Sequence, residues 1–120
     1  MAYMALPEFA RRRAARDLDI FGKRRDAGVS ADRLRLEYEF RGDAVTLVER
    51  RIPWQPGMEG QPWTRTPIAR FRYDVKAARW MLYWPDRDTQ WHVDDGIEPA
   101  PNLAPLLRQV DRDPSGIYWG

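Results

Sequence analysis

The sequence predicts an α+β fold: an N-terminal helix, an antiparallel meander sheet of four to five strands and a short C-terminal helix. Three observations indicate this order. Apolar residues near the start recur at helical spacing, the central part alternates apolar and charged residues with a period of two, and a second helical pattern comes near the end. Consecutive strands joined by short turns favour antiparallel pairing between neighbours.

The first element is a helix predicted over residues 7–26. Pro7 is acceptable there because a proline in the first helical turn sacrifices no hydrogen bond. Gly28 helps to end the helix. The apolar stripe expected to face the core comprises Leu6, Phe9, Ala10, Ala14, Leu18 and Phe21.

Two strands follow, because from Leu34 the pattern alternates strictly. One face carries Leu34, Leu36, Tyr38 and Phe40. The other face carries Arg35, Glu37, Glu39 and Arg41. Gly42 and Asp43 turn the chain, and residues 44–52 are predicted to return as the second strand.

An irregular loop is expected over residues 53–67. It holds Pro53, Pro56, Pro62 and Pro67, with Gly57 and Gly60 between them. The loop also carries Trp54 and Trp63, for which packing anchors are the favoured role, because an indole in a proline-rich loop buries well and keeps one polar group.

The second half of the sheet is predicted as a hairpin of residues 68–75 and 79–84, followed by a short strand over residues 91–93. A helix over residues 103–110 is expected next, with Asn102 as its cap. A turn over residues 111–116 then delivers Ile117, Tyr118 and Trp119 to the core, with Gly116 free to adopt a positive φ.

Length and composition favour one domain spanning residues 1–120 with one core. Six Trp, five Tyr and four Phe supply the apolar area that such a core needs. The absence of cysteine excludes disulfides, thiol nucleophiles, thiolate zinc sites and iron–sulfur clusters ligated by Cys, and no cofactor is expected. The apolar N-terminus is too short for a membrane span and precedes its basic residues, so a cytoplasmic protein is predicted.

Charge is distributed unevenly along the chain. The start is basic, with Arg11, Arg12, Arg13, Arg16, Lys23, Arg24 and Arg25. The end is acidic, with Asp86, Asp88, Asp94, Asp95, Glu98, Asp111 and Asp113. A basic segment of this kind attracts nucleic acid, an acidic partner or the other end of its own chain, and the internal or merely solvated alternative is favoured.

The order of motifs resembles a known family. LRLEYEF, VTLVERRIPW, PIARFRYD, WMLYW, WH and the closing LLRQVDRDPSGIYWG together resemble bacterial proteins catalogued as domain of unknown function 3024. The resemblance spans nearly the whole chain. It implies a small stand-alone bacterial protein and brings no activity to any residue.

The catalytic candidates centre on His92, the only histidine. Its neighbours Asp86 and Asp94 are the other weak catalytic candidates. Asp86, Asp88, His92 and Asp94 are also candidate ligands for Mg²⁺ or Mn²⁺, which would suit a metal-assisted hydrolase or nuclease. The favoured interpretation of these aspartates is structural, as turns at residues 85–88 and 94–96. A Ser–His–Asp assembly with Ser30 or Ser115 is disfavoured further.

The binding candidates lie on the sheet face that alternation places away from the helices. They are Arg35, Arg70, Arg72, Arg79 and Tyr83, joined by Arg41. Arginines mixed with aromatic rings bind single-stranded nucleic acid through phosphate pairing and base stacking. The alternative is a cross-strand ladder of ion pairs with Glu37, Glu39 and Glu49.

A non-enzymatic binding or interaction module is therefore the favoured function, with nucleic acid as its most specific form. A protein partner is the other binding hypothesis, engaged through an edge strand or the loop from Trp54 to Trp63. An enzyme ranks last. No membrane partner is expected, and the protein is predicted to be a monomer or a homodimer.

Overall fold

The computed structural model describes residues 6–25, 34–52, 60 and 62–119. Helix α1 covers Glu8–Arg25 and helix α2 covers Ala104–Arg112. Between them lie strands β1 (Leu34–Arg41), β2 (Ala44–Arg51), β3 (Thr66–Asp74), β4 (Arg79–Pro85) and β5 (Trp91–Val93). The predicted α+β fold is confirmed, and the sheet has five strands.

The sheet is an antiparallel meander in which each strand pairs with the next along the chain, in the order β1-β2-β3-β4-β5. The first hairpin turns at Gly42, whose φ of 64° suits glycine. One row of direct partners runs from Phe40 through Val45 and Phe71 to Leu82. Because direct partners point to the same side, this row defines one face of the sheet.

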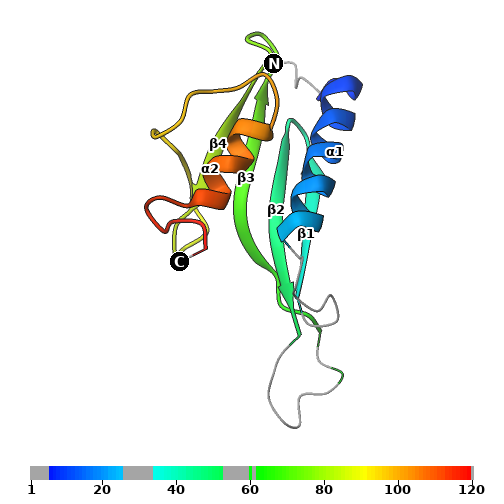
Figure 1. Cartoon of the computed structure of the whole chain (residues 1–120), viewed down its shortest axis with the longest axis vertical. Helices are drawn as coiled ribbons and strands as arrows, with labels where there is room; N and C mark the ends of the chain where they lie inside the picture. Colours follow the sequence, from blue (N-terminus) through cyan, green and yellow to red (C-terminus); the bar gives the residue numbers. More distant parts are fainter. Residues whose placement is uncertain (1–5, 26–33, 53–59, 61, 120) are drawn as a thin grey trace.

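Both helices pack on that face. Figure 1 shows α1 lying over β1 and β2, and α2 lying over β3 and β4. The buried core joins Val45, Phe71 and Leu82 to the inner sides of both helices. The other side of the sheet has no helix among the described residues, and we call it the open face.

Helix α1 buries a stripe of Ala10, Ala14, Leu18 and Phe21, as the helical spacing predicts. The prediction was wrong for Phe9, which is 70% exposed. Successive helical residues are separated by about 100° around the axis, so Phe9 falls beside the stripe rather than within it.

The C-terminal segment returns to the core, as predicted. Asp113 ends α2 in the left-handed conformation with a φ of 46°. Its carboxylate accepts hydrogen bonds from the backbone N–H of Tyr118 (3.0 Å) and Trp119 (2.9 Å). The Trp119 indole N–H donates to the carbonyl of Val110 at 2.9 Å. These bonds fix the buried side chain of Tyr118 beside α2.

One contact joins the basic start of the chain to its acidic end. Arg25 Nη1 lies 2.7 Å from Asp111 Oδ1, and the Arg25 guanidinium stacks over the Trp119 ring at 3.7 Å. Part of the charge asymmetry is therefore compensated within the chain. Among the described residues, no helix is both long enough and apolar enough to span a membrane.

Candidate functional site

The open face carries all the arginines and the tyrosine predicted as binding candidates. Arg35 and Arg41 come from β1, Arg70 and Arg72 from β3, and Arg79 and Tyr83 from β4. The register supports the predicted alternation, because Arg70 is opposite Tyr83 and also opposite Thr46, on the side away from the core. The structure thus brings these side chains onto one surface that spans four strands.

Small side chains of β2 form the floor of this surface. Ala44, Thr46 and Val48 are buried although no helix covers them in the described structure. Longer side chains from β1 and β3 flank them and cover them. The Arg70 guanidinium donates from Nε to Thr46 Oγ1 at 2.9 Å, which anchors this long side chain on the sheet.

Aromatic rings alternate with the arginines across the open face. Arg70 lies over the Trp91 ring at 4.3 Å, and Arg72 lies 5.8 Å from the centre of the Tyr83 ring. Guanidinium groups stack well on aromatic rings, so each pair presents a flat surface with a positive charge.

Ion pairs balance the β1 and β2 side of the open face. Arg50 lies 3.1 Å from Glu37 and 3.7 Å from Glu39. Arg65 donates two hydrogen bonds to the Glu39 carboxylate, at 3.1 and 2.5 Å. The hydrogen bond from Arg65 holds the pKa of Glu39 below its ordinary value. The predicted alternative of a cross-strand ladder is therefore present here.

Positive charge remains on the β3 side. Burial lowers the pKa of Arg70, and the neighbouring charges of Arg72, Arg41 and Arg65 lower it further. Arg72 forms an ion pair with Asp43 at 3.6 Å, whereas Arg41 and Arg70 enter no ion pair among the described residues. Burial is the main cause of the lowered pKa of Arg70 and Arg65 is paired with Glu39, so the positive charge that remains here comes from Arg70, Arg41 and Arg72.

Glu49 does not belong to the ladder that the sequence suggested. Its cross-strand partners are Leu36 and Thr66, and Leu36 packs against the core. Glu49 therefore points to the helix side, where its side chain is 14% exposed and pairs with Arg51 at 2.8 Å. The grouping was wrong because Glu49 continues the inward alternation of Val45 and Leu47.

The catalytic candidates form a pair rather than a cluster. His92 Nε2 lies 2.7 Å from Asp86 Oδ2, and the His92 ring lies 4.6 Å from that of Trp84. The hydrogen bond from His92 lowers the pKa of Asp86, and backbone hydrogen bonds lower it further. Asp86 Oδ1 accepts the backbone N–H of Asp88 and of Gln90, each at 2.9 Å, so the predicted turn exists.

Asp94, the third catalytic candidate, is hydrogen-bonded to groups other than His92. It accepts the Tyr118 hydroxyl at 2.8 Å and the backbone N–H of Gly96 at 2.8 Å. In the described part of the chain, no three His, Asp or Glu side chains are positioned to hold a metal ion. Ser115 and His92 line one shallow depression, but the described structure contains no hydrogen bond between them.

Of the two loop tryptophans, Trp63 is half-buried and lies under the Arg35 guanidinium at 4.3 Å. Trp54, like Ser30, lies outside the described residues. Sequence reasoning missed Arg65, Trp91 and Thr46 as parts of the open face. The alternation within β2 was the available signal for Thr46, whereas Arg65 precedes β3 and gave no periodic signal.

Comparison with known protein families gives a match over nearly the whole chain. Residues 6–120 match the family described as "Domain of unknown function (DUF3024)". No curated protein shows a significant match, and neither does any solved structure. Since the family match covers nearly the whole chain, this protein is a member of the DUF3024 family.

Proposed function

We propose that this protein is a non-enzymatic binding module that holds a single strand of nucleic acid on the open face of its sheet. The observation that carries the proposal is the cluster of Arg41, Arg70 and Arg72 on the open face, in which Arg70 and Arg72 lie against the Trp91 and Tyr83 rings. Clustered guanidinium groups repel one another, and a polyanion relieves that repulsion.

The chemistry of the surface suits phosphate and base together. Guanidinium groups bind phosphate oxygens through paired hydrogen bonds, and aromatic rings stack on bases of any sequence. On the open face, Tyr83 and Trp91 lie directly beside Arg72 and Arg70. A bound strand would therefore meet charge and stacking surface at adjacent positions.

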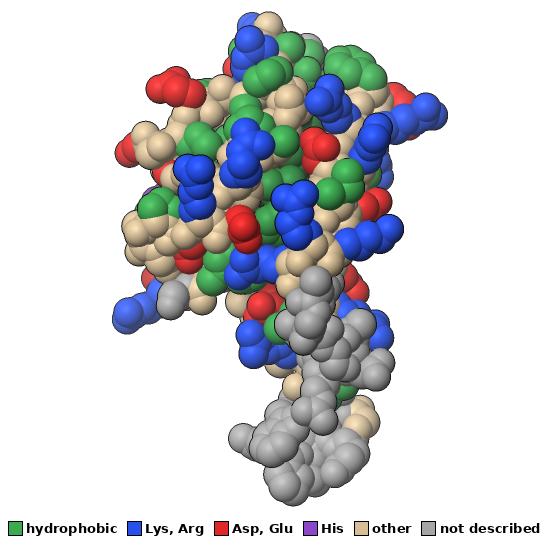
Figure 2. Space-filling view, in the orientation of Figure 1, with side chains coloured by type: hydrophobic (Ala, Val, Ile, Leu, Met, Phe, Trp, Pro, Cys, Tyr) green, Lys and Arg blue, Asp and Glu red, His purple; other side chains and the backbone are tan. Residues whose placement is uncertain are grey.

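The helix side offers a competing basic surface. Figure 2 shows Lys and Arg side chains distributed over the helices, with acidic side chains among them. Arg12, for example, pairs with Glu8 at 3.3 Å. The open face is favoured because it adds aromatic rings to the charge, and an experiment must separate the two surfaces.

The test is the fluorescence anisotropy of a short labelled single-stranded oligonucleotide, titrated at several salt concentrations. Three phosphate contacts, one for each clustered arginine, give a slope of log K against log salt of about −2.1. Affinity should therefore fall about 20-fold between 50 and 200 mM salt. An affinity that does not change with salt would contradict phosphate contact.

Two matched variants locate the surface. The double variant Arg41→Gln/Arg72→Gln removes two exposed charges from the open face, and the slope should become shallower by about 1.4. The control Arg13→Gln/Arg16→Gln removes two exposed charges from α1 and should retain the original slope. Equal losses in both variants would refute a site on the open face.

A further inference from the structure

A second feature lies on the other side of the sheet. A cavity of about 830 Å³ opens between the C-terminal half of α1, the ends of β1, β2 and β3, and α2. Its size falls within the range of about 300–1,000 Å³ that is usual for small-molecule sites. The open-face arginines do not line it, so it is a separate site from the proposed nucleic-acid surface.

About half of the lining of this cavity is apolar. Phe21 and Leu107 contribute from the two helices, and Leu36 and Ile68 contribute from the sheet. The C-terminal segment adds Tyr118 and Trp119, two large aromatic side chains. An apolar or aromatic body of moderate size would be desolvated here.

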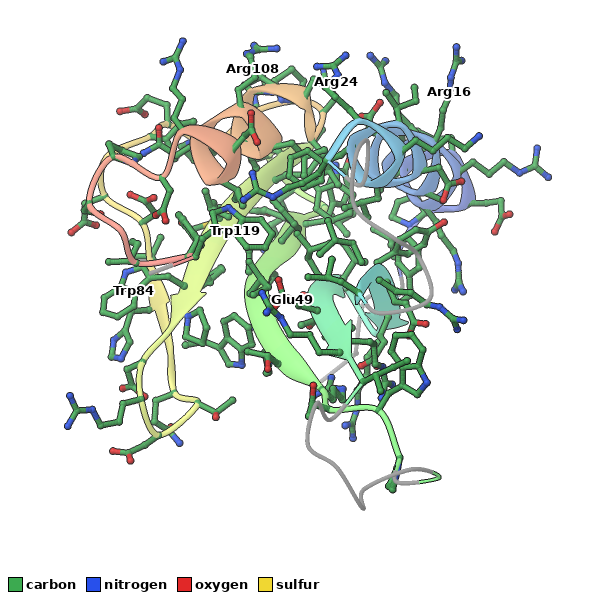
Figure 3. The ribbon with its side chains drawn as sticks, turned by 60° about the horizontal axis from the view of Figure 1, so that its bottom comes forward. Arg16, Arg24, Glu49, Trp84, Arg108 and Trp119 are labelled. Atoms are coloured by element: carbon green, nitrogen blue, oxygen red, sulfur yellow. The ribbon has the colours of Figure 1, made fainter. Side chains whose placement is uncertain are left out.

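Arginines from both helices and from β2 line the cavity, and two of them are already paired. Arg25 is held by Asp111 at 2.7 Å, and Arg51 is held by Glu49 at 2.8 Å. Within the described residues, Arg24 and Arg108 enter no ion pair. Figure 3 shows them on the solvent side of the helix layer, above Glu49 and Trp119.

A further polar group without a partner borders the cavity. Asp17 lines it, and the Oδ2 atom of Asp17 is buried with no hydrogen-bond partner in the described structure. A buried carboxylate oxygen without a donor is costly, but this oxygen is almost inaccessible and does not face the cavity.

We infer that this cavity binds a small amphipathic anion. Its apolar or aromatic body lies against Phe21, Ile68 and Leu107, and its acidic group lies between Arg24 and Arg108 at the mouth. Charge from two different helices at one mouth, above an interior that is about half apolar, matches a ligand with one acidic end.

The test uses two fluorescent probes with a similar aromatic body. The anionic probe is 1-anilinonaphthalene-8-sulfonate, and the neutral probe is N-phenyl-1-naphthylamine, which lacks the sulfonate. The folded wild-type protein should bind both saturably with a stoichiometry near one. The double variant Arg24→Gln/Arg108→Gln should weaken binding of the anionic probe by tenfold or more and leave the neutral probe unchanged.

Two further variants complete the design. Arg13→Gln removes one charge from the exposed surface of α1, and binding of both probes should stay unchanged. Ala104→Trp places a large ring into the lining and should block both probes. No saturable binding of either probe to the folded wild type would overturn the inference. An equal loss of both probes in the Arg24→Gln/Arg108→Gln variant would overturn the role of charge, since only a structural effect acts on both.

Discussion

Replacing Tyr118 with phenylalanine removes one oxygen atom from the core and nearly conserves the ring volume. Tyr118 is 5% exposed, and its hydroxyl donates to Asp94 at 2.8 Å. A hydrogen bond to a charged group contributes about 1.5–3 kcal/mol, and the lower end applies because water can reach the half-buried Asp94. For a chain of this length the unfolding entropy is about 0.25 kcal/mol/K, so the thermal midpoint should fall by about 6 °C.

The stability difference between the wild type and Tyr118→Phe should also change with pH, and the size of that change can be worked out independently. Burial raises the pKa of Tyr118 above its ordinary value of 10.0, and the charges of Asp94 and Asp113 raise it further. Above pH 10 the unfolded chain therefore loses the tyrosine proton while the folded protein keeps it. The stabilisation that Tyr118 contributes is therefore fully present at pH values below its pKa in the unfolded chain, and it is lost as the pH rises above that value. Between pH 9 and 11 this loss amounts to about 1.4 kcal/mol in the wild type and is absent in Tyr118→Phe.

Urea unfolding followed by tryptophan fluorescence at pH 7, 9 and 11 measures both effects. The wild type should be more stable than Tyr118→Phe at pH 7 and 9, and the difference should nearly vanish at pH 11. Tyr83→Phe is the matched control, because within the described residues the Tyr83 hydroxyl makes no hydrogen bond. Equal losses in the two variants at pH 7 would refute the reasoning. So would a difference that stays constant up to pH 11.

Three further predictions follow from the structure. Ending the chain at Gly116 removes the buried Tyr118 and should lower the thermal midpoint by about 12 °C or more in calorimetry, whereas an unchanged midpoint would show that the segment is dispensable. His92→Ala should raise the pKa of Asp86 in a carbon-13 NMR titration, because the hydrogen bond from His92 is the main cause of its lowering; an unchanged pKa would contradict that bond. Because folding lowers the pKa of Asp86, this carboxylate stabilises the folded protein at pH values above its pKa in the unfolded chain. This stabilisation is lost as the pH falls through the pKa of the folded protein. Mn²⁺ or a chelator should leave the melting curve unchanged, and a rise in the midpoint with Mn²⁺ would reveal a metal site.

The strands were predicted well because a half-covered sheet imposes a strict alternation on the sequence. Strand β1 was expected over residues 34–41 and lies there, and the short β5 was likewise expected over residues 91–93. Several turns were also predicted correctly, because a turn depends on the residues within it. Gly42, Gly116 and Asp86 occupy turns that their side chains, or the lack of one, make favourable.

Features that depend on contacts distant in sequence were not predicted. The irregularity between Leu47 and Val48 shifts the register against β3, and nothing in the local pattern indicates it. The cavity arises because α1 and α2 cover different strands, which no helical periodicity encodes. Pairing of the basic start with the acidic end of the chain belonged to the alternative that the sequence favoured, but the particular pair of Arg25 with Asp111 became visible only in three dimensions.

The sequence predicted which side chains lie on the open face, but it did not predict which of their charges are paired. Alternation alone placed Arg70 and Tyr83 on one surface. It did not reveal that Arg65 neutralises Glu39, or that Arg70 is anchored by Thr46. Those contacts decide where positive charge remains, so the proposed site could be narrowed only from the structure.

Two indole N–H signals offer the most direct measurement of where nucleic acid binds. Trp91 lies beneath Arg70 on the open face, and Trp119 lies beneath Arg25 on the helix side. During a titration with a single-stranded oligonucleotide, followed by nitrogen-15 NMR, the Trp91 signal should shift saturably while the Trp119 signal stays in place. A shift of Trp119 with Trp91 unchanged would place binding on the helix side and contradict the proposed function.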